Sequence, residues 1–497
     1  MASRSKAMRS APDAAAAPNA LRRLKERLSE IADLGAAASV LSWDQAVFMP
    51  PKAAEARGRQ LARLSKLLHE KATDKALGKL LDELRGYAEG LDPASDDAAL
   101  IRVSRRDYER SIRVPTDYTV RATEHGARSY QAWTEARPAN DFARMRPLLE
   151  TTLDLSRELS TFFPGYAHVM DPHIGPEEGL TVAEIDRLFQ SLRRRLVPLV
   201  KAITAKAPAD DSCLRRSYPE ERQLAFARRV AEALGYDLAR GRIDKSPHPF
   251  CSSFHRNDVR ITTRVQRNDL SDALFSVLHE VGHALYELGV AEALEGTLLD
   301  HGASAGVHES QSRLWENIVA RSRPFWRHYL PELQKVFPSQ LGSVGLDEFY
   351  RAINKVTPSL VRTDADEVTY NLHVMLRFDL EKRMLEGSLE IRDLPEAWNA
   401  RYASDLGVTP PDDRDGVLQD VHWYAGGIGG YFQGYTIGNI LSAQIWEAAL
   451  AQRPSIGEAI GRGEFGELRS WLADSLHAHG RKFTGPEVVR KATGRAM

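Results

Sequence analysis

The chain has 497 residues, enough to bury a large core, and its charges nearly cancel, with 67 Lys and Arg against 68 Asp and Glu. This balance excludes a strong overall field, so we expect neither nucleic acid nor a membrane surface as a partner. The two cysteines, Cys213 and Cys251, are too few for a disulfide framework and suit a reducing compartment. No apolar run reaches the roughly 18 residues of a membrane span. We therefore expect a cytoplasmic protein.

Residues 1–19 are rich in Ala, Ser and Arg and lack the continuous apolar stretch of a secretory signal. We predict a disordered tail there. From residue 20 onward, apolar residues recur at three- and four-residue spacing over most of the sequence, which predicts amphipathic helices. Thr181 and Glu184 form the capping box of one of them. No linker divides the chain, so we predict one mainly α-helical domain over residues 20–497.

Residues 259–265 interrupt this helical pattern, because apolar and polar side chains alternate there. The alternation predicts a strand whose odd-numbered positions pack inward. Arg260, Thr262 and Arg264 would then face the other way. We expect this strand to belong to a small β-sheet next to the helix that follows it.

That next helix is predicted over about residues 272–288, with Gly289 able to end it. It carries the pattern His-Glu-x-x-His at His279, Glu280 and His283. Two imidazoles four residues apart lie one turn apart and can bind the same ion. Glu280 follows the first His directly, where its carboxylate can reach a water on that ion, as in zinc peptidases. The helix is otherwise apolar, so we predict a metal site.

A catalytic zinc needs a third protein ligand and an open position for water. The metzincin pattern, in which a Gly and a third His follow shortly, is absent after His283. The third ligand must therefore come from further along the chain, and spacing alone does not choose among the candidates. These are Glu292, Glu295, Asp300, His301, His308 and Glu309.

Six short motifs occur in a fixed order along the chain. They are His248-Pro249-Phe250, the D-x-R-x-T of Asp258 to Thr262, the H-E-x-x-H of His279 to His283, His308-Glu309-Ser310, the I-[RA]-x-x-A-D-like stretch Val361 to Asp366, and the G-x-x-Q-D-x-H-W of Gly416 to Trp423. Leu41 to Asp44 and Met49 to Pro51 add to the pattern, and Val361 replaces Ile by another apolar residue. On these motifs the chain resembles the thermostable carboxypeptidase (carboxypeptidase Taq) family, peptidase family M32, over about residues 20–497.

The resemblance implies an almost entirely α-helical fold with a deep substrate cleft, and a homodimer. It implies a metallocarboxypeptidase that removes single C-terminal residues from peptides with broad specificity and spares C-terminal Pro. The metal would be zinc, with cobalt able to substitute, and Glu309 would join His279 and His283 as the third ligand.

The same resemblance assigns further site residues. Glu280 would act as general base toward a water activated by the metal. The Gly-Tyr segment 429–435 is similar to loops in related helical zinc peptidases, where Tyr and a preceding His stabilise the oxyanion. We expect Tyr435 as first choice for this donor, Tyr431 as second, and His422 as a helper.

Recognition of the substrate's free carboxylate requires a cation, and Arg offers a permanently charged two-point contact. Arg362 fits this role by its motif. Arg260 on the predicted strand competes with it, although Arg260 could instead pair with Asp258. We also expect His248 to line the cleft.

Two other functions compete with the carboxypeptidase hypothesis. The first is a zinc endopeptidase, oligopeptidase or dipeptidyl carboxypeptidase with the same metal core. The second is a non-catalytic helical scaffold stabilised by metal. The sequence does not favour it, because a structural zinc site needs no Glu280 and normally closes its fourth position.

Overall fold

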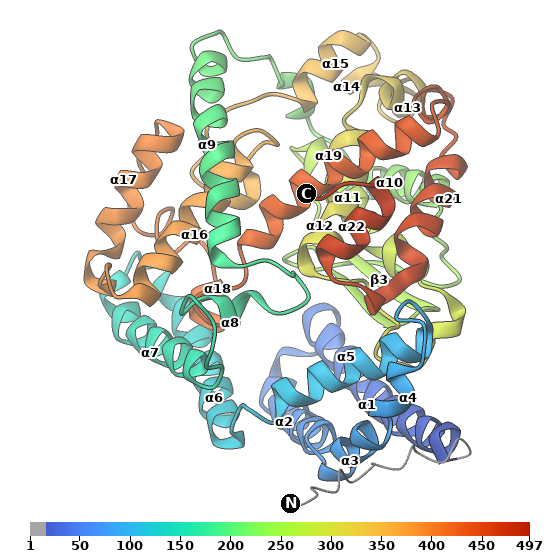
Figure 1. Ribbon diagram of the computed structural model, residues 1–497. Helices are drawn as coiled ribbons and strands as arrows, with labels where there is room; N and C mark the ends of the chain where they lie inside the picture. Colours follow the sequence, from blue (N-terminus) through green and yellow to red (C-terminus); the bar gives the residue numbers. More distant parts are fainter. Residues whose placement is uncertain (1–15) are drawn as a thin grey trace, which may run out of the picture.

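The computed structural model describes residues 16–497, and it is mainly α-helical with one small sheet, which confirms the predicted fold class (Figure 1). The first helix, α1, spans Ala16–Val47, so residues 16–19 are helical rather than part of the predicted tail. The rest of that tail prediction lies outside the described residues. No helix between residue 16 and the C-terminus combines the length and the apolar character needed to cross a membrane.

The N-terminal helices form a group of their own at the bottom of Figure 1. They are α1 (Ala16–Val47), α2 (Ala54–Ala72), α3 (Lys75–Glu83), α4 (Arg85–Glu89) and α5 (Asp96–Ser111). Leu24, Leu81 and Leu84 are fully buried within this group. Its apolar cluster also takes in Val290 and Leu294 from the segment that follows the metal-motif helix, so this group packs against the part of the chain that carries the candidate site.

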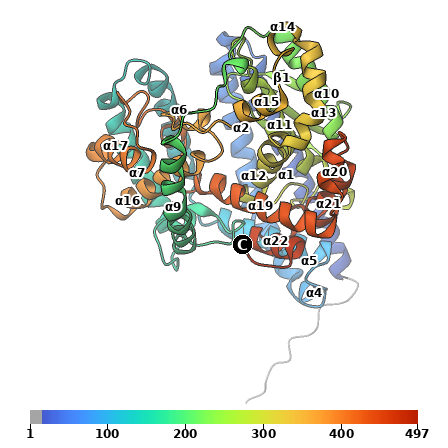
Figure 2. The ribbon, with the colours of Figure 1, turned by 90° about the horizontal axis from the view of Figure 1, so that it is seen from above.

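Two larger helical groups lie side by side above it, and both views separate them (Figures 1 and 2). One consists of α6 (Thr116–Ala136), α7 (Phe142–Thr161), α8 (Asp171–Ile174), α9 (Val182–Thr204), α16 (Tyr370–Glu386), α17 (Leu394–Leu406) and α18 (His422–Ala425). The other consists of α10 (Glu220–Leu234), α11 (Leu270–Leu288), α12 (Ala305–Arg313), α13 (Arg323–Val336), α14 (Pro338–Leu341), α15 (Leu346–Ile353), α19 (Gln433–Gln452), α20 (Ile456–Gly461), α21 (Gly466–Ser475) and α22 (Gly485–Thr493).

Partly buried ion pairs join helices of the first of these groups. Arg193 on α9 pairs with Asp405 on α17 and with Asp379 on α16, at 2.5 and 3.3 Å. The Thr181–Glu184 capping box begins α9, as the sequence predicts.

The sheet has three strands, β1 (Ile243–Lys245), β2 (Cys251–His255) and β3 (Asp258–Thr263), in the order β1-β3-β2. β3 runs parallel to β1 and antiparallel to β2, and it packs against α11 as expected. Val259 and Ile261 are fully buried, which agrees with the predicted alternation. Thr262 is also buried, because its hydroxyl accepts a hydrogen bond from the Phe250 amide (3.0 Å) and another from Ser246 Oγ (2.7 Å). The Thr262 hydroxyl therefore finds its hydrogen-bond partners inside the protein rather than in solvent.

Helix α12 packs closely between α11 and α19, and a glycine on each of these two helices permits the close approach. A Cβ atom on Gly282 of α11 would lie 2.5 Å from Ser312 Cα and 2.6 Å from the Gln311 carbonyl oxygen of α12. A Cβ atom on Gly438 of α19 would lie 2.5 Å from Cγ of Glu309. Both distances are far below van der Waals contact, so only glycine allows the three helices to approach this closely. The packing fixes the position of Glu309 relative to α11.

We expect Gly282→Ala to destabilise the fold by about 1–3 kcal/mol, because the new methyl group meets backbone atoms that cannot rotate away. Gly35→Ala is the matched control, since Gly35 also lies inside a helix but has no atom within 4 Å of the added Cβ. It should stabilise the protein slightly, by about 0.4–1 kcal/mol. Thermal and urea unfolding of both variants measure the difference. Equal effects of the two substitutions would contradict the close-packing argument.

Candidate active site

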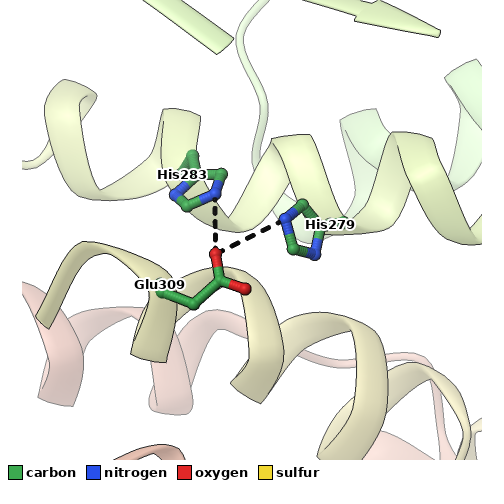
Figure 3. A group of neighbouring side chains, drawn as sticks. All are labelled: His279, His283 and Glu309. Atoms are coloured by element: carbon green, nitrogen blue, oxygen red, sulfur yellow. Dashed lines mark ion pairs between the residues drawn. The ribbon is translucent and has the colours of Figure 1, made fainter. Parts of the chain in front are cut away.

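The two motif histidines lie on the inward face of α11 (Leu270–Leu288), which begins two residues earlier than predicted. Asp269 caps its N-terminus by accepting a hydrogen bond from the Ser271 amide (2.9 Å). His279 and His283 are one turn apart and face α12 (Figure 3). An apolar stripe on another face of this helix is buried and consists of Leu274, Leu278, Val281, Leu285 and Leu288.

Glu309 on α12 meets these two histidines across the helix interface (Figure 3). Its Oε2 atom lies 3.6 Å from Nε2 of His279 and 3.4 Å from Nε2 of His283. One ligand atom from each of the three residues lies within 4.8 Å of the other two, as a shared ion requires. Burial alone would raise the pKa of Glu309, but the charge of Arg313, whose Nε is 2.6 Å away, and the nearby His279 lower it well below its ordinary value. The carboxylate is therefore held ionised.

The other five candidates for third ligand lie elsewhere. They make the following contacts: His308 and His301 with Glu287, Asp300 with the Gly296 amide, Glu292 and Glu295 with Arg256.

A carboxylate also orients His279 from behind. Glu316 accepts a hydrogen bond from Nδ1 of His279 at 2.9 Å, which turns Nε2 toward Glu309. Glu316 lies in η4 (Leu314–Ala320), a π-helical segment that continues α12, and such segments are frequent at functional sites. Arg313 and Arg321 lie within 3.3 Å of its two oxygens. The pair of arginines balances the buried charge of Glu316.

His283 is oriented through a second imidazole. Its Nδ1 lies 2.7 Å from Nδ1 of His308, and Nε2 of His308 lies 2.7 Å from Oε1 of Glu287. When His308 donates to Glu287, its Nδ1 is free to accept from His283. Nε2 of His283 then keeps its lone pair facing Glu309, which is the form that binds a metal. Burial lowers the pKa of His283 to about 4, which favours the neutral ring.

A cavity of ≈ 530 Å³ opens beside His279 and Glu309. Glu280 lines it and is only 6% exposed, and burial raises the pKa of its carboxyl to about 7. His248 lines the same cavity, as predicted for the cleft, and its Nδ1 lies 2.7 Å from the Pro249 carbonyl oxygen.

The two candidate oxyanion donors, Tyr435 and Tyr431, differ in their position relative to the cavity. Tyr435, at the start of α19, lines the cavity, and its hydroxyl lies 3.5 Å from Nε2 of His422, which also lines it. Tyr431 is half exposed, at 51%, and is not among the cavity-lining residues. Gly429 and Gly430 both have positive φ and turn the chain just before Tyr431 and α19. Tyr435 therefore stays the first choice for the oxyanion donor.

Arg362 lines the cavity and is only 4% exposed. Its Nε and Nη2 atoms donate to Asp420, at 2.9 Å for Nη2 and Oδ1, and its Nη1 donates to the Tyr370 hydroxyl at 2.9 Å. Arg377 donates to the other oxygen of Asp420 at 2.5 Å. One carboxylate therefore pairs with two guanidinium groups, which leaves a net positive charge beside the cavity.

Arg260 does not line the cavity. It makes a two-point pair with Asp258, at 2.7 and 2.8 Å, and its guanidinium lies over the rings of Trp43 and Phe254. Arg362 rather than Arg260 therefore stays the first candidate for substrate binding. The alternative, a pair with Asp258, is what the structure shows.

Sequence reasoning missed several residues that support the site. Glu178, in the loop before α9, accepts a hydrogen bond from the Gly306 amide at 2.8 Å and so holds the N-terminal end of α12. Glu316 and Glu287 orient the histidines, and Asp420 anchors Arg362. Only Asp420 had a signal, because it is the Asp of the Gly416-to-Trp423 motif; the other three follow from packing between distant segments.

Comparison with known proteins now identifies the family. The carboxypeptidase Taq (M32) metallopeptidase profile matches residues 23–497, nearly the whole chain. The chain belongs to the M32 metallopeptidase family. Thermostable carboxypeptidase 1 of Thermus thermophilus is 40% identical to this M32 chain over 489 residues, which covers 96% of this chain and 95% of the relative.

Solved structures of M32 enzymes have the same fold as this chain. The M32 carboxypeptidase of Deinococcus radiodurans is 49% identical with a TM-score of 0.93, and metallocarboxypeptidase 1 of Trypanosoma cruzi is 30% identical with a TM-score of 0.90. Each alignment covers 96% of this chain and 96% of the other. The chain is thus a metallocarboxypeptidase of the M32 family, with a metal cofactor, and the hypothesis of a non-catalytic scaffold is wrong.

We expect Glu316→Gln to weaken metal binding by about 10- to 100-fold, the usual effect of removing a carboxylate that orients a metal-binding His. The amide is isosteric but carries no charge. If its oxygen still accepts from Nδ1 of His279, its NH₂ group faces Arg321, which is also a donor. Competition with a chromogenic chelator measures the affinity.

Asp405→Asn is the matched control, because Asp405 is also a buried carboxylate paired with an arginine, but in the other helical group. It should lower the melting temperature and leave metal affinity unchanged. If both variants lose metal equally, the loss reflects general stability and not the orientation of His279.

Proposed function

We propose that this M32 enzyme is a zinc-dependent carboxypeptidase that removes single C-terminal residues from peptides with broad specificity and acts poorly on C-terminal Pro. One observation carries the proposal: His279 and Glu309 of the His-His-Glu cluster, Glu280 and Arg362 line one cavity. Exopeptidase chemistry needs these three functions within the length of one residue of substrate. The preferences for side chains rest on the family resemblance.

The donor set fits zinc. Two imidazole nitrogens and one carboxylate oxygen are a usual protein ligand set of a catalytic zinc, and cobalt, with similar ligand preferences, could substitute. His279 and His283 are fixed by hydrogen bonds on their far nitrogens, so their near nitrogens are preset for an ion. When bound, the metal would polarise the scissile carbonyl and lower the pKa of a water toward ~7.

Glu280 would move the proton. It lies next to His279 on α11 and lines the cavity beside Glu309, where its carboxylate can accept a proton from the attacking water. The same carboxyl group can then donate that proton to the nitrogen of the leaving amino acid. Its small exposure keeps bulk water from competing for the proton.

Tyr435 and His422 would stabilise the charge that develops on the substrate's carbonyl oxygen. Both line the cavity, and their polar atoms lie 3.5 Å apart, so one oxygen atom can contact both. Burial raises the pKa of the Tyr435 hydroxyl above its ordinary value, so it stays a hydrogen-bond donor. This supports Tyr435 as the principal donor.

Arg362 would bind the terminal carboxylate. Its guanidinium carbon lies 5.0 Å from the centre of the Tyr435 ring. This closeness supports removal of one residue, because each further residue of substrate would add about 3.3–3.6 Å between scissile bond and carboxylate. An endopeptidase, oligopeptidase or dipeptidyl carboxypeptidase would need more room beyond the scissile bond.

A product analysis separates these activities. An unblocked peptide is incubated with the metal-loaded enzyme, and the products are followed by mass. Successive losses of one C-terminal residue support the proposal, whereas dipeptide release or internal cuts would support the alternatives. A cytoplasmic location, consistent with two free cysteines, and the homodimer that the family resemblance implies are further parts of the proposal.

We expect Glu280→Gln to keep the fold and the bound metal and to lose about 10²–10⁴-fold in kcat, the range for a positioned general base. The amide has nearly the same volume but cannot take up a proton. Metal content, peptide binding and turnover should be measured on the same preparation. Turnover close to that of the unmodified enzyme would exclude Glu280 as the base.

The carboxylate contact can be tested by a double-mutant cycle. Amidation of the peptide's C-terminus removes the charge that Arg362 would bind, which should cost ~30- to several-thousand-fold in kcat/KM. Arg362→Lys should lower kcat/KM on the free acid and reduce the ratio between acid and amide, because an ammonium cannot make the planar two-point contact. The two changes should be non-additive, since they act on one interaction.

Arg260→Lys is the matched control for this cycle, because Arg260 is paired with Asp258 outside the cavity. It should leave the ratio between acid and amide unchanged. A ratio that depends on Arg260 and not on Arg362 would reverse the assignment.

A further inference from the structure

A second cavity, of ≈ 350 Å³, lies away from the site described above, between α5 and the segment 163–176 that leads from α7 past α8. One wall is a single face of α5, where positively charged side chains recur at three- and four-residue spacing. The opposite wall is apolar and aromatic. The α5 wall consists of Arg102, Arg105, Arg106, Glu109 and Arg110, extended by Arg113 in the turn after the helix, and the other wall consists of Phe163, Pro164, Tyr166 and Pro176. We call this cavity the α5 groove.

The charges of the α5 groove are not balanced. Among residues 16–497, no carboxylate oxygen lies within 4.0 Å of the guanidinium nitrogens of Arg102, Arg110 or Arg113, whereas Arg105 and Arg106 each have such partners. The partners of Arg106 are shared, because Asp107 and Glu177 also pair with Arg481. The groove therefore carries an excess of positive charge.

Arg110 shows that this is more than a solvated row of charges. Its guanidinium lies 4.3 Å from the centre of the Phe163 ring and donates to the Pro172 carbonyl oxygen at 2.5 Å. It is half-buried, and this burial lowers its pKa. Tyr166 and Asp107 oppose this shift in pKa, but within residues 16–497 no carboxylate oxygen lies within 4.0 Å of the guanidinium. A half-buried guanidinium without a direct ion pair is costly, and the cost falls when an anion occupies the groove.

The arrangement specifies the chemistry of that anion. Arg106 and Arg110 lie one turn apart on the same face of α5, and Arg113 follows in the turn just after the helix ends at Ser111. Guanidinium groups bind phosphate oxygens in planar, two-point contacts. The opposite wall offers Tyr166, which is 47% exposed, as a face on which a ring can stack.

We propose that the α5 groove binds an organic polyphosphate of nucleotide type, with its phosphates on Arg106, Arg110 and Arg113 and its ring against Tyr166. This site is separate from the metal centre and adds a ligand class to which the carboxypeptidase reaction gives no role. The volume of the groove suits a single small molecule rather than a polymer.

Binding is measured by isothermal titration of the metal-loaded enzyme in excess Mg²⁺, so that the probes do not withdraw the bound metal. The probes are ATP, inorganic tripolyphosphate and hexaglutamate. ATP should bind more tightly than tripolyphosphate, and Tyr166→Ala should remove that difference. Equal binding of hexaglutamate would overturn the proposal, because the groove would then attract any polyanion.

Arg113→Gln is the decisive variant, because Arg113 is exposed and makes no side-chain hydrogen bond with other described residues, so its loss should not affect folding. It should weaken ATP binding by about 10- to 100-fold, the effect of losing a charge-assisted contact. Arg194→Gln, on the exposed part of α9, is the control and should have no effect. Arg264→Gln, in the metal-centre cavity, tests the other location. Loss of binding with Arg264→Gln but not with Arg113→Gln, or no binding of ATP at all, would overturn the proposal.

Discussion

The close approach of α12 to both α11 and α19 is the constraint on which the candidate site depends. The three metal-site side chains come from two helices, and their spacing is set by how near those helices lie. Gly282 and Gly438 remove the side chains that would hold the helices apart. Glu178 holds the N-terminal end of α12 through the Gly306 amide. Glu309 is thus positioned by backbone packing and needs little freedom of its own.

Buried charge is the second organising feature, and two clusters of carboxylates and guanidinium groups lie beside the cavity. Glu309 and Glu316 lie in the interior with Arg313 between them, and Asp420 lies between Arg362 and Arg377. Isolated buried charges would be very costly, so each carboxylate is placed against a guanidinium. The two clusters differ in net charge. In the first, two carboxylates flank Arg313 next to the motif histidines. In the second, two guanidinium groups flank Asp420, which leaves a net positive charge that suits an anionic substrate terminus.

The sequence predicted most of the fold and about half of the site, for physical reasons. Helical periodicity and the His-Glu-x-x-His spacing are local patterns, so the mainly α fold, the small sheet and the position of α11 could be predicted. Spacing left six choices for the third ligand, and only the family resemblance selected Glu309. Glu316 could not be predicted, because its contact with His279 depends on how a π-helical segment packs. Tyr431 and Tyr435 differ only in the turn of a glycine-rich loop, which no periodicity encodes.

The pairing of α11 with α12 has a consequence for folding. The metal-site residues are 30 positions apart in sequence, from His279 to Glu309, and no single helix holds a complete ligand set. An ion could bind strongly only after both helices have docked, so it would stabilise the native state over partly folded ones by mass action. Metal uptake would then act as a late checkpoint in maturation. A chain whose helices are misaligned would stay metal-free, and an immature peptidase would be inactive toward neighbouring polypeptides.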